Sequence, residues 1–168
     1  MILRTVLVFL VLSFGSAFAA GSDSSGGSSG GGGESKPENL YKSSINLIKR
    51  AGKLEKKDKK EKAEKLYSQA FKKLSKALKK DKNNPDILNY MGYTSRKIGN
   101  FSEAESYYLK GLAIDPRHNG INEYLGELYV QTNRIDKANE RLEVLKKCNC
   151  EEYGELELII KTRGSKVY

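Results

Sequence analysis

After residue 37 the apolar residues of this chain recur every three or four positions, the spacing that places them on one face of an α-helix. Two such stripes fill the stretch from 38 to 82, and further ones follow as far as residue 163. The pattern therefore predicts seven helices and no strand. The apolar positions of the first two predicted helices are Leu40, Tyr41, Ile45, Ile48, Ala51 and Leu54, then Ala63, Leu66, Ala70, Leu74, Ala77 and Leu78.

Within this helical pattern the sequence repeats at a spacing of 34 residues. Tyr90-Met91-Gly92 returns as Tyr124-Leu125-Gly126, and Ala104 returns as Ala138. A fixed period of this length indicates a repeat protein in which each unit is a helical hairpin. Because one hairpin cannot cover its own apolar face, about three of them must stack to form a stable core.

The period, the small residue in one helix and the alanine in the next resemble the tetratricopeptide repeat (TPR), in particular that of exported bacterial proteins. The matching positions are Gly92, Gly126, Ala104, Ala138 and Pro116. The resemblance implies an all-α fold, a TPR-like α-solenoid of about three helical hairpins plus a C-terminal capping helix. The implied boundaries are a helical domain at 36–164 with a divergent repeat at 38–84, repeats at 85–118 and 119–150, and a capping helix at 151–163.

Two packing features are expected from this alignment of the chain with the TPR pattern. In the first hairpin the distance to the next repeat is seven residues too long, nearly two helical turns, so a lengthened second helix keeps its apolar face aligned. In the two regular repeats, Gly92 and Gly126 are expected to let the two helices of each hairpin approach closely, where a larger side chain would push them apart.

The first twenty residues have the three parts of a secretory signal peptide: one positive charge, an apolar run from Val6 to Phe14 and the small-residue ending Ala17-Phe18-Ala19. We therefore predict a cleaved signal peptide at 1–20; the alternative is an uncleaved anchor, although the apolar run is short of the ~20 residues of a spanning helix. The Gly- and Ser-rich stretch 21–35 predicts a disordered linker. The expected location is periplasmic or secreted, with no transmembrane segment after cleavage.

The net charge of +9 is unevenly distributed along the chain. Residues 36–82 carry 17 basic and 6 acidic side chains, whereas 83–168 carry 12 and 13. The lysine-rich first hairpin therefore leaves an alternative function open, that of a module that tethers the protein to anionic surfaces. The lysine run lacks interleaved aromatic residues and arginines, which argues against nucleic acid as the partner.

Few residues suggest chemistry. His118 is the single histidine and follows Pro116 in a predicted turn, so neither a histidine metal cluster nor a catalytic triad is indicated. Cys148 and Cys150 flank one residue before the capping helix and form a candidate disulfide, as two cysteines do in an exported protein. A redox-active pair and a metal site are the alternatives for these thiols. We expect no enzyme activity, no cofactor and no bound metal.

The TPR resemblance also implies a function. Proteins of this family hold an extended or helical segment in a concave groove that the first helix of each repeat lines. The expected function is thus an exported scaffold for a protein or peptide partner; the alternatives are the anion-tethering module and a thiol redox protein using Cys148 and Cys150. The groove positions implied by the resemblance are Asn89, Tyr93, Arg96, Lys97, Glu123, Glu127, Val130 and Gln131.

Overall fold

The computed structural model describes residues 35–165, so the predicted signal peptide and all but the last residue of the predicted linker lie outside the described residues. Within 35–165 the chain forms seven α-helices and no strand, as predicted. These helices are α1 (Pro37–Glu55), α2 (Lys60–Lys80), α3 (Pro85–Lys97), α4 (Phe101–Ile114), α5 (Asn119–Gln131), α6 (Ile135–Leu145) and α7 (Glu151–Lys161). None of the seven is long and apolar enough to cross a membrane.

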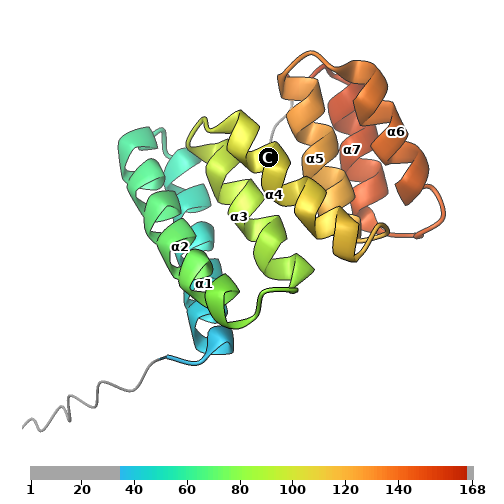
Figure 1. Ribbon diagram of the computed structural model, residues 1–168. Helices are drawn as coiled ribbons and strands as arrows, with labels where there is room; N and C mark the ends of the chain where they lie inside the picture. The colour runs from blue at the N-terminus through green and yellow to red at the C-terminus, as the bar shows by residue number, and fades with distance from the viewer. Residues whose placement is uncertain (1–34, 166–168) are drawn as a thin grey trace, which may run out of the picture. The chain divides into compact units, whose positions relative to one another are not determined.

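The helices pair in chain order into three hairpins, and α7 packs against the last of them (Figure 1). The hairpins are α1–α2, α3–α4 and α5–α6, and neighbouring hairpins touch through α2 with α3 and through α4 with α5. Each hairpin thereby buries its apolar face on the next one. This arrangement is the predicted α-solenoid of three hairpins with a terminal helix.

Particular residues begin and end the helices of the two regular repeats. The side chains of Asn84 and His118 cap α3 and α5, each accepting a hydrogen bond from a backbone N–H three residues on. The same two helices are followed by left-handed backbone at Gly99 (φ 85°) and Asn133 (φ 57°). Gly and Asn adopt this conformation most readily, which is why the turn recurs at the repeat spacing.

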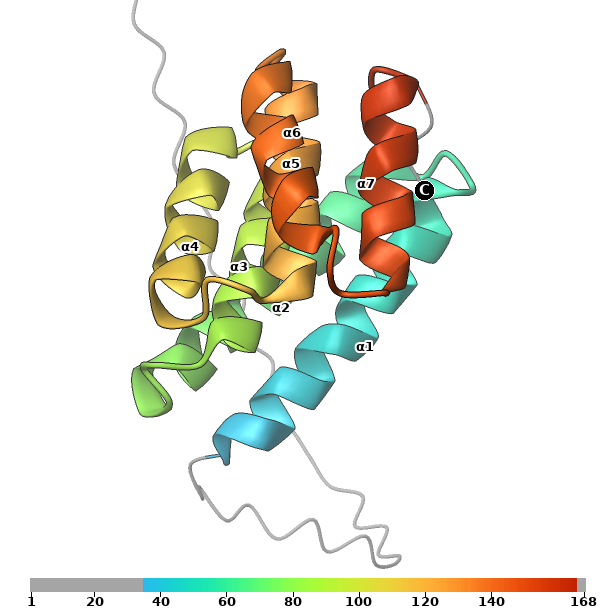
Figure 2. The ribbon, with the colours of Figure 1, turned by 90° about the vertical axis from the view of Figure 1, so that its right-hand side faces the viewer.

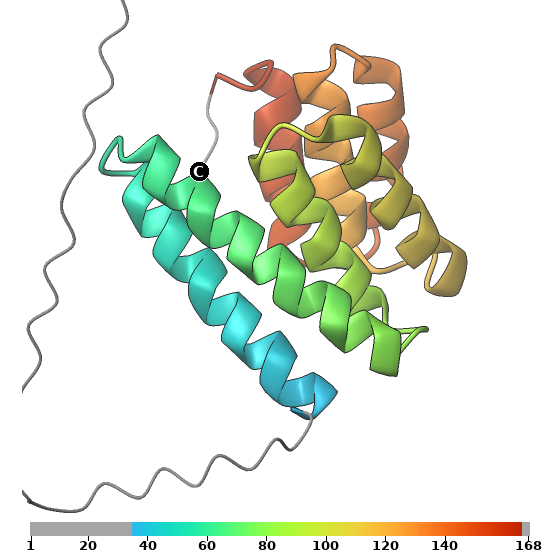
Figure 3. The ribbon, with the colours of Figure 1, turned by 60° about the vertical axis from the view of Figure 1, so that its left-hand side comes forward.

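The first hairpin differs from the others in length. Its helices have 19 and 21 residues, and Figure 3 shows them lying side by side in front of α3. Both helices are longer than those of the regular repeats, whereas the sequence led us to expect lengthening of the second alone. The core of this hairpin combines Tyr67 and Leu74, both fully buried, with small side chains: Ala51, Ala63, Ala70 and Ala77 are at most 1% exposed.

The two repeat glycines have different neighbours. A Cβ atom added at Gly92 would collide with the ring of Tyr108 in α4, so this glycine allows close approach within its own hairpin, as predicted. For Gly126 the prediction is wrong. A Cβ atom there would lie 2.6 Å from Cδ1 of Leu156 in α7, so Gly126 makes room for the terminal helix instead. Figure 2 shows α7 beside α5 and α6.

Candidate functional site

The odd-numbered helices enclose two adjoining hollows, which we call the inner groove. The larger, of about 560 Å³, lies among α1, α3 and α5, and the smaller, of about 240 Å³, lies among α3, α5 and α7. Tyr93, Lys97 and Tyr124 line both hollows. The remaining lining residues of the larger hollow are Ile45, Ile48, Lys49, Gly52, Glu55, Lys56 and Tyr90, and those of the smaller are Arg96, Glu123, Glu127 and Glu155.

Tyrosine rings form a continuous row, of which Tyr90, Tyr93 and Tyr124 line the inner groove. Tyr41 packs edge-on against Tyr90, with ring centroids 5.8 Å apart, and Tyr90 lies 6.4 Å from Tyr93. Tyr93 then contacts Tyr124 at 5.1 Å and Tyr67 at 6.0 Å. Edge-to-face contacts at such distances hold aromatic rings in fixed orientations. Burial raises the pKa of Tyr93 above its ordinary value, so its hydroxyl stays protonated and able to donate a hydrogen bond at neutral pH.

A buried ion pair joins the two regular repeats beneath this row. The Arg96 guanidinium lies 2.6 Å from the Glu127 carboxylate, and the two residues are only 4% and 6% exposed. The guanidinium is also 5.5 Å from the ring of Tyr93 and 5.8 Å from that of Tyr124, within the range of cation–π attraction. Burial acts to lower the pKa of Arg96, but Glu127, Tyr108 and Tyr93 outweigh it and raise the pKa, so the group stays charged.

A second ion pair ties the first hairpin to α3. The Lys97 ammonium lies 2.8 Å from the Glu55 carboxylate, which also accepts a hydrogen bond of 2.9 Å from the Tyr67 hydroxyl. Lys97 contacts the Tyr67 ring as well, at 5.7 Å. The charge of Lys97, which lines both hollows of the inner groove, is therefore already balanced by Glu55 of the same chain.

Carboxyl groups crowd the α7 end of the inner groove. Glu123 is 4% exposed, and its pKa is raised to about 10. Burial is the main cause; a hydrogen bond with the Glu155 side chain and the charges of Glu127, Glu155 and Glu152 add to it. Glu123 is consequently a neutral acid at pH 7.

Comparison with known proteins identifies the fold. No family model matches the chain, and the search of curated proteins found no match. Among solved structures, the Yersinia enterocolitica type III secretion chaperone SycD in complex with a peptide of the translocator YopD is 19% identical, covering 76% of this chain and 88% of its own, with a TM-score of 0.57. The fold is a TPR-like α-solenoid. The second TPR domain of human RPAP3 in complex with an HSP70 peptide is 18% identical, covering 74% of this chain and 98% of its own, with a TM-score of 0.49. The Arabidopsis OM64 TPR domain is 15% identical, covering 73% of this chain and 98% of its own, with a TM-score of 0.47.

The structure brings most of the predicted groove residues together. Tyr93, Arg96, Lys97, Glu123 and Glu127 all line the smaller hollow, although the charged ones are largely buried and engaged with one another.

The other predicted groove residues lie outside both hollows. Asn89 is 4% exposed and packs against Gly120, Val130 is buried, and Gln131 is exposed at the end of α5. Whether any predicted residue contacts a partner stays a prediction.

Sequence reasoning missed nine lining residues of the inner groove. Six belong to the first hairpin, and the others are Tyr90, Tyr124 and Glu155; the six are Ile45, Ile48, Lys49, Gly52, Glu55 and Lys56. Tyr90 and Tyr124 stand at the same place in the two repeats, so their 34-residue spacing was the available signal. Gly52 and Glu155 carry no such signal, because they lie in the divergent first hairpin and in the terminal helix, outside the regular repeats.

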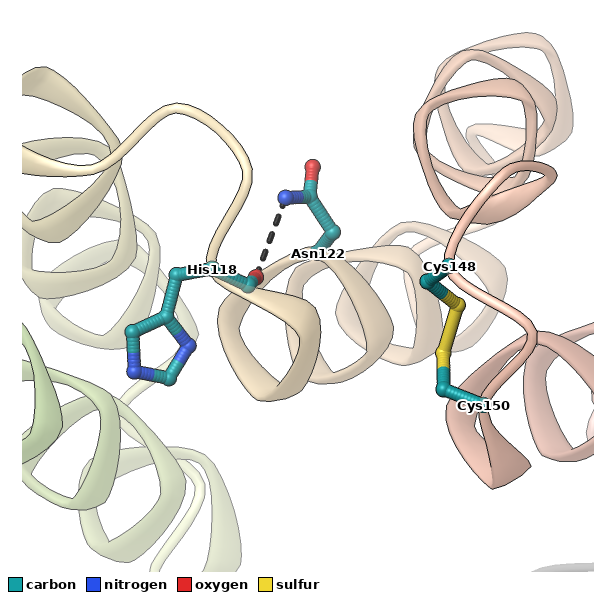
Figure 4. Close-up of a disulfide and its surroundings, with 4 residues drawn as sticks. All are labelled: His118, Asn122, Cys148 and Cys150. Atoms are coloured by element: carbon teal, nitrogen blue, oxygen red, sulfur yellow. Dashed lines mark hydrogen bonds between the residues drawn. A yellow bond between two sulfur atoms is a disulfide. The ribbon is translucent and has the colours of Figure 1, made fainter.

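The two cysteines form a disulfide in the turn between α6 and α7 (Figure 4), and neither of them lines the inner groove. The same figure shows Asn122, whose side-chain amide donates a hydrogen bond to the His118 carbonyl. His118 also lies 3.1 Å from Asp86 at the start of α3, so it links two repeats besides capping α5. Within residues 35–165, no three histidine, cysteine or acidic side chains gather closely enough to hold a metal ion.

Proposed function

We propose that this protein is an exported scaffold that binds a polypeptide segment in the inner groove and catalyses no reaction. The observation that carries the proposal is the groove itself: about 560 Å³ of open space above a row of tyrosines, with an adjoining 240 Å³ hollow. Aromatic side chains supply large, rigid contact area at low entropic cost, and they dominate the energetics of many interfaces.

The groove lining favours a segment with apolar or aromatic side chains and some negative charge. Ile45, Ile48 and the tyrosines offer apolar surface, while the exposed Lys49 and Lys56 stand at the rim. The buried cations are compensated within the chain, so the rim lysines are left to attract an acidic residue of the ligand. A peptide ligand is also present in the SycD complex, whose fold this chain shares.

Export is the second part of the proposal. It is supported by the signal-peptide pattern at 1–20 and by the pairing of Cys148 with Cys150, because disulfides persist in oxidising compartments such as the periplasm. N-terminal sequencing of the exported protein should find a start near Ala20 or Gly21. A start at Met1 would contradict cleavage and favour an anchored protein.

Blocking the groove without harming the fold gives the sharpest test of binding. Gly52 lines the larger hollow, and a Cβ atom added there meets only the Tyr67 hydroxyl, at 4.0 Å. Gly52→Phe should therefore fill the hollow. It should also keep or raise the melting temperature, since glycine inside a helix is destabilising by about 0.5–1 kcal/mol relative to alanine.

Gly154→Phe is the matched control, because Gly154 is also helical, is exposed and has no side chain within 4 Å of an added Cβ. Peptides selected from a displayed library on the parent protein should lose at least about tenfold in affinity for Gly52→Phe, the loss of a single well-packed contact of about 1.4 kcal/mol. They should bind Gly154→Phe unchanged. Equal affinity for both variants would contradict the proposed site, as would the failure of any peptide to be selected.

A further inference from the structure

The outward face of α2 carries a straight ridge of lysines. Lys65, Lys72, Lys76 and Lys79 are all exposed and are spaced by seven, four and three residues. At 100° per residue they fall within about 60° of one another. Tyr67 and Leu74, two of the five buried residues of α2, lie on the opposite side of the helix.

The acidic side chains of the first hairpin leave this ridge largely uncompensated. Glu55 is directed to Lys97 and Tyr67, Asp81 accepts a hydrogen bond from Asn84, and Asp58 pairs with Lys60 in the turn. Glu61 and the exposed Glu64 lie near the start of α2, at one end of the ridge, and Glu38 lies in the first turn of α1. With 17 basic and 6 acidic side chains in residues 36–82, the hairpin keeps a net charge of +11.

The neighbouring helix on this side presents apolar side chains together with the exposed Glu103 and Lys110. α4 meets α2 through the rings of Tyr107 and Phe71, whose centroids are 5.8 Å apart. On its exposed side α4 carries Leu109, Ala113 and Ile114, and Leu109 is 49% exposed. Lysines and exposed aliphatic groups are thus presented by two helices that touch each other.

We propose that this α2–α4 face binds to the surface of a membrane containing anionic phospholipids. Lysines on flexible stems suit a diffuse negative surface, and each one near such a surface strengthens attachment. Exposed aliphatic side chains add to attachment by entering the interface between headgroups and acyl chains. Nucleic acid is disfavoured, because no aromatic side chain of α1 or α2 is exposed for base stacking and Arg50 is the single arginine in residues 36–82.

Membrane attachment through this face leaves the inner groove available. Both hollows are lined by residues of α1, α3, α5 and α7, and α2 contributes none of them. A protein attached through its lysine ridge can therefore hold a peptide at the same time. The attachment does not depend on the proposed peptide binding, so the two proposals succeed or fail separately.

Vesicle co-sedimentation of the full-length chain tests the membrane proposal. Phosphatidylcholine vesicles with and without phosphatidylglycerol separate charge-dependent attachment from any insertion of the apolar N-terminal segment. The test variant is Lys65→Glu/Lys72→Glu/Lys76→Glu. The matched control is Lys146→Glu/Lys147→Glu/Lys161→Glu, which makes the same change in net charge at exposed positions of other elements.

We expect the parent to bind phosphatidylglycerol vesicles and to be released as salt shortens the Debye length to about 3 Å near 1 M. The test variant should bind on the order of 100-fold more weakly, at about fivefold per lysine, and the control less than about threefold. Equal weakening of the two variants would overturn the proposal, as would equal binding to both vesicle types. Tighter binding to duplex DNA or polyglutamate than to vesicles would overturn it too. Matching circular dichroism melts show that both variants are folded.

Discussion

The first hairpin and the α5–α7 region place their charges differently. In α1–α2 Ser44 is the one buried residue classed as polar, and every lysine except Lys73 is exposed. In α5, by contrast, Asn122, Glu123 and Glu127 are all buried, and Glu127 pairs with Arg96 of the preceding repeat. Charge at the surface can be changed at little cost, whereas charge inside must keep its partner. Substitutions should therefore cost most between α3 and α7 and least on the lysine ridge.

Breaking the buried ion pair should have the largest effect. Arg96→Ala leaves the Glu127 carboxylate buried without its cation, and removing one partner of such a pair costs about 3–5 kcal/mol. Urea denaturation followed by circular dichroism measures the loss. Lys72→Ala on the ridge is the control and should change the free energy of unfolding by less than about 0.5 kcal/mol.

The double variant Arg96→Met/Glu127→Leu sharpens this result. It removes both charges and keeps apolar volume, so it should regain most of the stability lost in Arg96→Ala. If Arg96→Ala instead had the same free energy of unfolding as the Lys72→Ala control, the contrast between the two regions would not hold.

The protonated Glu123 should make stability fall as pH rises. Its pKa is about 10 in the folded protein and near its ordinary value of 4.5 when unfolded, so between these values the folded state binds the extra proton. The associated stability is complete below pH 4.5 and is lost progressively as pH rises toward 10, by at most about 1.4 kcal/mol per pH unit. Between pH 6 and 8 the parent should lose up to about 2.7 kcal/mol more than Glu123→Gln, which has no proton to release there. Parallel pH profiles for the two proteins would contradict a buried neutral acid.

Gly126→Leu should displace α7. The added side chain would enter the space that Leu156 occupies, and overpacking of this kind costs about 1–3 kcal/mol. Gly154→Leu changes the same residue type on α7 in open space and should not destabilise the protein. Amide hydrogen exchange locates the effect: protection should fall first in α7 and persist in α1–α2. If protection fell in α6 while α7 stayed protected, Gly126 would contact α6 and not α7, which would contradict the packing described above.

Removing the disulfide should have the smallest of these effects. Cys148 and Cys150 close a ring of only three residues, for which the loop-entropy relation gives about 1–2 kcal/mol. Cys148→Ser/Cys150→Ser should lose this amount in a denaturant titration and bind selected peptides as the parent does. Thiol titration of the native exported protein should detect no free cysteine. A readily reduced pair would instead favour the thiol redox alternative.

The sequence was sufficient for the fold because a 34-residue period and helical spacing depend on the chain alone. Tyr90 and Tyr124 show this, since they occupy equivalent positions of successive repeats and both line the larger hollow. The pairings were not predictable. The TPR resemblance placed Arg96 and Glu127 on the groove face and Gly126 at the contact within its own hairpin, but it does not say which side chains they meet. The sequence pattern therefore suggested that charged side chains line the groove. In the structure these charges are compensated in ion pairs, and the tyrosine row lies above them.

The central claim is that a polypeptide binds along the odd-numbered helices. Titration of the isotope-labelled protein with a selected peptide, followed by NMR, tests it most directly. The largest chemical-shift changes should occur at Gly52, Tyr90, Tyr93 and Tyr124, which line the larger hollow on three separate helices. Changes concentrated in α2, α4 or α6, with these four residues unaffected, would contradict the account.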